Sequence, residues 1–216
     1  MKCKVYCGGM HESVQQQVLQ INGFSTGIIP FKYLGVPLSS RKLTIHHCGP
    51  LVHRILAKIQ HWTARLLSYA GRYQLIRNVL FGITAYWMNV FPMPKGVIKH
   101  IEAICRNIMW KGNTDKTNKA LVAWDFICNP KGAGGLSITS LKEWNIATMG
   151  KLFWNIQAKA DKLWVKWVNT YYLKQHNAMD WQSKNCSWIL ASVFKCRDKI
   201  KGTNAWATVI YTNWEI

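Results

Sequence analysis

The stretch Pro50–Arg65 (PLVHRILAKIQHWTAR) decides the fold, because it carries two helical repeats at once. Pro50 suits the first turn of a helix, where its missing N–H group is not needed. One apolar stripe follows at helical spacing: Leu51, Ile55, Ile59 and Trp62. A second face repeats cations at the same spacing: Arg54, Lys58, His61 and Arg65. The stretch therefore predicts an amphipathic helix with a basic ridge beside its buried face.

Helical periodicity continues on the C-terminal side of this stretch. Ser68 is placed to cap a second helix, which ends at the turn Phe91–Pro94. This second helix carries Arg72 and Arg77. A third helix is predicted over Lys95–Trp110. Its buried face is expected to hold Val97, Ile101, Ile104 and Ile108.

Nearer the C-terminus, Asn129–Gly135 predicts a glycine-rich turn. Ser140 and Glu143 have the spacing of a capping box at the start of another helix. Asp161 is interpreted as the cap of a further helix, and Ser187 as the start of a last one. The whole C-terminal part is therefore expected to be helical.

The N-terminal part has a different pattern. Lys4–Tyr6 predicts a short strand, and Val14–Ile21 a short helix. Phe31–Leu38 predicts an extended, apolar segment that is interrupted at Gly35 and Pro37, and Pro37 confines it to a sheet edge or a strand end. We therefore expect a mainly α fold, in which a helical bundle follows a short extended, β-forming N-terminal segment.

The charge balance is strongly basic, with 28 Lys and Arg residues against 9 Asp and Glu, a net charge of +19. A field of this size favours a polyanionic partner, although a solvated basic surface is the simpler interpretation. Twelve Trp and 8 Tyr residues accompany the cations, and this combination suits base stacking. Most of these Trp side chains are nevertheless expected to lie in the core.

The sequence favours an intracellular protein without a membrane span. Met1–Met10 has no apolar run long enough for a secretory signal. Seven Cys residues outside a secreted context indicate reduced thiols. The most apolar stretch, Val79–Phe91, is shorter than the roughly 20 residues that a spanning helix needs.

Catalytic and metal-binding patterns are weak. Nucleotidyl transfer and ribonuclease H chemistry need clustered carboxylates, and the sequence has no Asp-Asp, Asp-x-Asp or Asp-x-Glu. Two groups of potential zinc ligands occur, namely Cys3, Cys7 and His11, and the cluster His46–Cys48. Neither group completes a four-ligand zinc site. We expect no catalytic residues, no metal and no cofactor.

Several blocks in fixed order carry a resemblance. They are Phe31–Leu38 (FKYLGVPL), Leu67–Arg72 (LSYAGR), Gln74–Ile76 (QLI), Pro92–Pro94 (PMP), Ile101–Arg106 (IEAICR) and Gly134–Leu136 (GGL). Together they resemble the reverse transcriptases of plant non-LTR (LINE-type) retrotransposons. The matching region is the thumb and connection between the polymerase palm and a zinc-binding module, and relatives often also carry a ribonuclease H domain.

The resemblance implies a truncated RNA-directed DNA polymerase, located in the nucleus, whose palm with its Tyr-x-Asp-Asp turn is absent or supplied elsewhere. Residues 1–38 would be a remnant of the palm-exit segment, 39–128 a thumb-like helical region and 129–216 a Trp-rich helical region. The implied partner is an RNA/DNA template–primer duplex, bound without sequence preference. The expected contacts are Arg54, Lys58, His61, Arg65, Arg72 and Arg77.

Two alternatives remain open at this level. One is a transposon relic without a selected function. The other is a protein-interaction fragment that uses the Trp-rich C-terminal helices. The side chains expected to act there are Trp164, Trp167, Trp181 and Trp188.

Overall fold

Helices make up most of the chain, which confirms the predicted mainly α fold. The computed structural model describes residues 4–7, 10–28, 31–33, 35–39, 42–61, 67–112, 121–174, 176–182 and 186–201. The chain divides into two compact units, Met1–Leu43 and Thr44–Ile216. The finer division of the second unit near residue 128 stays a prediction.

The N-terminal unit holds the strands. Strand β1 (Lys4–Val5) pairs in parallel with β2 (Ser25–Thr26), and helix α1 (Glu12–Asn22) connects them. The segment predicted to be extended with an interruption at Gly35 is a hairpin of β3 (Phe31–Tyr33) and β4 (Val36–Leu38). The reason is local, because Gly35 takes a left-handed φ of 83°, which favours glycine and reverses the chain. In a two-stranded hairpin both strands are edges, so Pro37 is tolerated.

The C-terminal unit begins with η1 (His46–Cys48) and α2 (Gly49–His61), the helix predicted from the opening stretch. Leu51, Ile55 and Ile59 are buried, as the apolar stripe predicts. Trp62, the fourth predicted member of that stripe, lies outside the described residues.

The second predicted helix is one continuous helical segment, but its helix type changes from α to π and back to α. It consists of α3 (Tyr69–Gln74), the π-helical segment η3 (Leu75–Leu80) and α4 (Phe81–Val90). Ser68 caps it as predicted, and its hydroxyl accepts a hydrogen bond from the N–H of Gly71 at 3.2 Å. In η3 the turns widen, so that the N–H of Phe81 donates to the carbonyl of Ile76.

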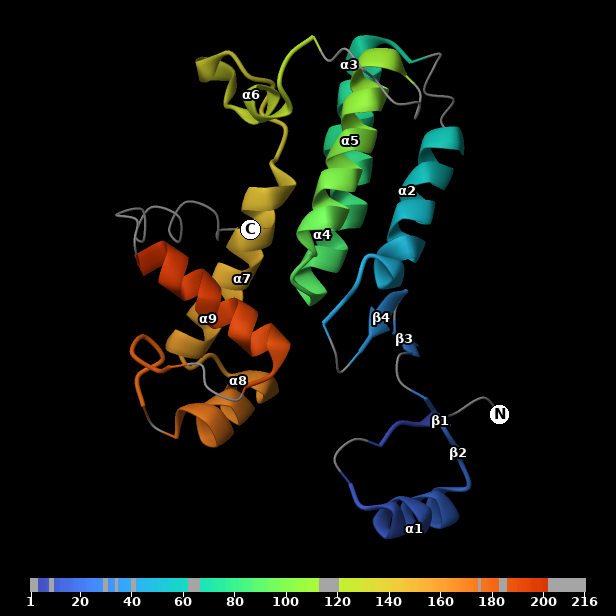
Figure 1. Cartoon of the computed structure of the whole chain (residues 1–216), viewed down its shortest axis with the longest axis vertical. Coiled ribbons are helices and arrows are strands. Elements are labelled where there is room, and N and C mark those ends of the chain that lie inside the picture. The colour runs from blue at the N-terminus through green and yellow to red at the C-terminus, as the bar shows by residue number, and fades with distance from the viewer. Residues whose placement is uncertain are drawn as a thin grey trace. The chain divides into compact units, whose positions relative to one another are not determined.

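Helix α5 (Lys95–Lys111) packs against α3 and η3 (Figure 1). It ends at Gly112, which has a left-handed φ of 71°. Its predicted inner face is confirmed, since four side chains at helical spacing are buried: Val97, Ile101, Ile104 and Ile108.

A short helix and a tight turn follow. Helix α6 (Trp124–Cys128) leads into the predicted glycine-rich turn, which contains η4 (Lys131–Ala133). Gly135 is required there, because a Cβ atom at this position would overlap the carbonyl group of Asn129.

The last helices are α7 (Leu141–Gln157), α8 (Leu163–Val168), the π-helical segment η5 (Asn169–Leu173) and α9 (Trp188–Lys201). Helices α7 and α9 pack together (Figure 1). Between them Phe153 and Phe194 form an edge-to-face pair, with ring centroids 6.1 Å apart. The Ser140 cap is confirmed, because its hydroxyl accepts from the N–H of Glu143 at 3.3 Å.

The interpretation of Asp161 as a helix cap is wrong. Lys162 occupies the N-cap position of α8, and no side chain caps this helix end. The carboxylate of Asp161 instead lies 2.5 Å from the ammonium of Lys166. Lys166 lies one helical turn into α8, and its ammonium competes with the backbone N–H groups for this carboxylate.

Two hydrogen bonds connect the first helices of this unit to α7. The N–H of Met93 donates to Oδ1 of Asn145 at 2.9 Å, and Nδ2 of Asn145 donates to the carbonyl of Met93 at 3.2 Å. Phe91 stacks on Trp188 of α9 close by, with ring centroids 5.8 Å apart. Among the described helices, none combines the length and the apolar character that a membrane crossing requires.

We expect Asn145→Ala to lower the free energy of unfolding by about 1–3 kcal/mol, because it leaves the buried N–H of Met93 without a partner. Urea denaturation measures the change. Asn78→Ala is the matched control, because it removes an exposed amide hydrogen bond to Gln74. The control should change the free energy by less than about 0.5 kcal/mol. Equal effects of the two variants would contradict the assigned role of Asn145.

Candidate nucleic-acid interface

Two of the predicted contact residues lie on the outer face of α2. Arg54 and Lys58 are one helical turn apart and exposed. The opposite face holds the buried stripe that begins at Leu51. The amphipathic pattern therefore places both cations where a polyanion can reach them.

Arg77 is exposed and held in place by a tyrosine. Its Nη1 donates to the hydroxyl of Tyr73 at 3.0 Å, and its guanidinium carbon lies 5.9 Å from the centroid of that ring. The same hydroxyl donates to the carbonyl of Leu136 at 2.9 Å, which ties Tyr73 to the segment before α7. The guanidinium is therefore positioned by the neutral side chain of Tyr73.

Arg72 has a different environment. It is half-buried, and its Nε donates to the carbonyl of Leu67 at 3.1 Å, just before the Ser68 cap. Part of its hydrogen-bonding capacity thus stabilises the start of α3. His61 ends α2, but its side chain is outside the description, and Arg65 lies outside the described residues. The continuous ridge from Arg54 to Arg65 stays a prediction.

The distribution of carboxylates is a stronger indication than the ridge, and the helical pattern alone missed it. No Asp or Glu occurs between Glu12 and Glu102, so the run of residues 13–101 has no carboxylate. All the predicted contact residues lie within this run. Their charges cannot be neutralised by a neighbour in sequence, which concentrates positive charge on α2, α3 and η3.

Glu102 ends the run, and it is partly buried on α5. Burial raises its pKa, as does the nearby carboxylate of Asp125, while Arg106 and Lys142 act in the opposite direction.

Within the part of the chain that the structure describes, no three His, Cys, Asp or Glu side chains converge as metal ligands would. Two carboxylates form close ion pairs instead, Asp161 with Lys166 and Asp198 with Arg197. Cys7 and the cluster around His47 are each described, while Cys3 lies outside the described residues.

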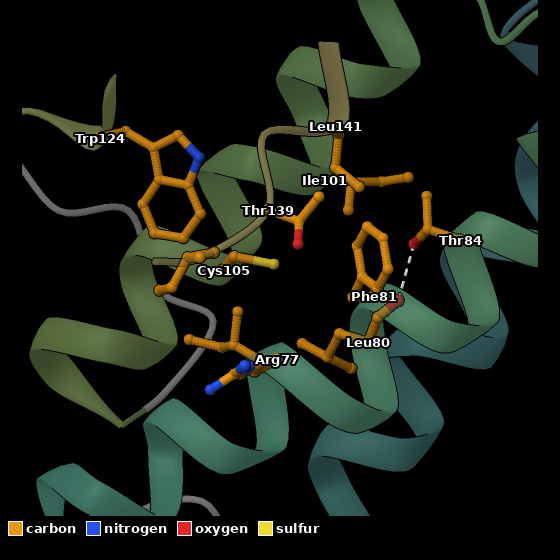
Figure 2. Close-up of a pocket in the computed structure, with 11 residues that line it drawn as sticks. Arg77, Leu80, Phe81, Thr84, Ile101, Cys105, Trp124, Thr139 and Leu141 are labelled. Carbon is orange, nitrogen blue, oxygen red and sulfur yellow. Dashed lines mark hydrogen bonds between the residues drawn. The ribbon is translucent and has the colours of Figure 1, made fainter. Parts of the chain in front are cut away.

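A pocket with about 310 Å³ of empty space, part of it open to solvent, lies between η3, α4, α5 and α6 (Figure 2). Its walls are mainly apolar, and Arg77, Thr84 and Thr139 supply polar groups. The hydroxyl of Thr84 donates to the carbonyl of Leu80 at 2.8 Å and is therefore satisfied within its own helix. These walls suit packing, and they bring no base next to a nucleophile.

Four cysteines are kept protonated by their surroundings. Burial raises the pKa of Cys105 to about 12, with a smaller contribution from Glu102. Burial also raises the pKa of Cys48, Cys128 and Cys196 to about 11. These thiols behave as small hydrophobic groups.

Three of the four Trp side chains predicted for protein interaction pack against other aromatic or core residues. Trp188 stacks on Phe91, and Trp181 lies 4.7 Å from the ring of the buried Phe194. Trp164 is half-buried against the α7–α9 core. Trp167 differs, because 46% of its surface is exposed.

The geometry thus defines a basic, mainly α chain with exposed, positioned cations. No protein-family model matches it. The chain is similar to an Arabidopsis thaliana protein named "Putative ribonuclease H protein", with 24% identity over 154 residues. The similarity covers 71% of this chain but 25% of that relative, so the chain spans about a quarter of the relative's length. The assignment to a reverse-transcriptase thumb stays a prediction.

The raised thiol pKa values predict a loss of stability in alkali. Unfolding returns each thiol to an ordinary pKa near 9.0, so stability is complete below pH 9 and falls as the pH rises toward the folded values of about 11 to 12. Cys105→Ala should flatten this decline by up to about 1.4 kcal/mol per pH unit. Urea denaturation with a reductant between pH 7 and 10.5 measures it.

The control for this prediction is Thr148→Ala, which changes another buried side chain but no titrating group. It should lower stability by a similar amount at every pH. An unchanged alkaline slope in Cys105→Ala would show that this thiol does not contribute.

Proposed function

We propose that this chain is the thumb-like, nucleic-acid-binding part of a plant retrotransposon reverse transcriptase. It binds an RNA–DNA duplex through phosphate contacts, without sequence preference. The observation that carries this proposal is the carboxylate-free run of residues 13–101, which contains the exposed cations Arg54, Lys58 and Arg77.

The spacing of these cations suits a phosphate backbone. Arg54 and Lys58 are separated by about 6 Å along α2, close to the rise of two phosphates along one strand, about 6.8 Å. Arg77 adds a guanidinium that Tyr73 already orients, so less side-chain freedom is lost when it contacts a phosphate. Contacts of this kind provide affinity and position but do not distinguish bases.

The polymerase chemistry belongs, in this proposal, to a palm outside this sequence. Two-metal catalysis needs carboxylates close together, and the acidic residues of this chain are widely separated in sequence. The chain would contribute the grip on the template–primer duplex, and the palm would contribute the reaction.

The name of the Arabidopsis relative supports the same proposal. Proteins of the resembling family often carry a ribonuclease H domain, and the relative's name refers to ribonuclease H. Both this name and the basic helices favour a partner that contains RNA, DNA or their hybrid.

The salt dependence of binding tests the proposal. We expect the affinity for a 20-base-pair RNA–DNA hybrid, measured by fluorescence anisotropy, to fall steeply with salt, because bound phosphates release counterions. The double variant Arg54→Gln/Lys58→Gln should make the slope of log K against log salt shallower by about two.

The control is Lys195→Gln/Lys199→Gln, which removes two exposed cations at the same i, i+4 spacing on α9. This control should leave the slope close to that of the unchanged protein. If both double variants reduce the slope equally, the contact is diffuse and the α2 site is wrong. Absence of binding at low salt would instead favour the relic hypothesis.

A further inference from the structure

The helical segment formed by α8 and η5 has an unusual outer face. Its inner face is anchored in the core by Val165, Val168 and Leu173, each at most 3% exposed. The outer face of such a helix is normally polar. Here it carries large apolar and aromatic side chains four residues apart: Leu163, Trp167 and Tyr171, at 86%, 46% and 66% exposed.

The ring of Trp167 on this outer face is connected to the core by a series of aromatic contacts. Trp167 lies 6.0 Å from Tyr171 and 5.2 Å from Tyr172, measured between ring centroids. Tyr172 contacts Trp181 at 6.3 Å, and Trp181 contacts the buried Phe194 at 4.7 Å. Trp167 is therefore held rigidly at the surface, so that binding a flat ligand loses little side-chain entropy.

Lysines accompany the aromatic side chains. Lys166 and Lys174 lie on the same exposed stripe, and Lys159 and Lys162 precede it. Residues 159–174 hold four lysines and one aspartate, Asp161, which pairs with Lys166. Both partners of that pair are more than 60% exposed, so the ion pair is weak and can exchange for a phosphate.

We infer that this stripe, defined as Leu163, Lys166, Trp167, Thr170, Tyr171 and Lys174, binds single-stranded nucleic acid. Bases stack on Trp167 and Tyr171, and the lysines contact the phosphates. Unpaired bases are required, because the faces of paired bases are covered by their neighbours in a duplex. The stripe is thus a second site, separate from the proposed duplex contact on α2.

Other occupants fit less well. An anionic membrane surface prefers a longer aliphatic face, and Leu163 is the one aliphatic side chain among the six residues of the stripe. An acidic peptide would satisfy the lysines but would leave the two exposed rings unused. The combination of braced rings and flanking cations favours a polyanion that also carries flat bases.

The test uses the full chain and a fluorescein-labelled 12-nucleotide oligouridine. Trp167→Ala and Tyr171→Ala should each weaken binding by roughly tenfold, and Trp167→Phe should retain most of the affinity. Tyr86→Ala is the matched control, because it removes a similarly exposed aromatic ring, 41% exposed, from α4. Thermal melts verify that each variant remains folded.

The two nucleic-acid sites are separable in this experiment. The Arg54→Gln/Lys58→Gln variant should weaken binding to the hybrid duplex more than binding to oligouridine, and Trp167→Ala should do the opposite. Unchanged oligouridine affinity in Trp167→Ala overturns the inference, whatever the duplex result. Flotation with phosphatidylserine vesicles that depends on Trp167, without oligouridine binding, would also overturn it, as would a Trp167-dependent dimer.

Discussion

The two hydrogen bonds between Asn145 and the backbone of Met93 are the interaction on which the arrangement of the helical unit depends. Apolar burial holds the helices together but is non-directional, so it does not fix how far α7 slides along α4 and α5. A carboxamide carries both N–H donors and an acceptor oxygen, and Asn145 uses one of each on the N–H and the C=O of Met93. The position of α7 then determines where α8, η5 and α9 lie.

A second constraint comes from the shortage of carboxylates. Arg72 donates to a carbonyl oxygen and Arg77 to a hydroxyl oxygen. The buried Arg197 instead contacts the carboxylate of Asp198 as well as two backbone carbonyls. Neutral acceptors orient a guanidinium without cancelling its charge. The protein thereby gains order and keeps a positive surface, and this combination is what a phosphate-binding protein requires.

Helix positions were predictable because their determinants are local. Ser68 and Ser140 cap helices through hydrogen bonds three residues ahead, and the stripe from Leu51 to Ile59 needs only helical spacing. The prediction for Asp161 failed because two local effects compete. Its carboxylate can accept hydrogen bonds at a helix end or pair with Lys166, and the structure shows the ion pair. The candidate site was predictable as a set of cations, whereas the inward use of Arg72 was not.

The sequence by itself determined the helical spans, the positive charge and the long run without carboxylates, since these follow from residue order and composition. Only the tertiary structure decided which aromatic side chains lie inside. Trp164 and Trp167 are three residues apart on one helix, yet the first packs against the core and the second faces solvent. Helical spacing makes both faces of this segment apolar. The buried face is the one that packs into the core formed with α7 and α9.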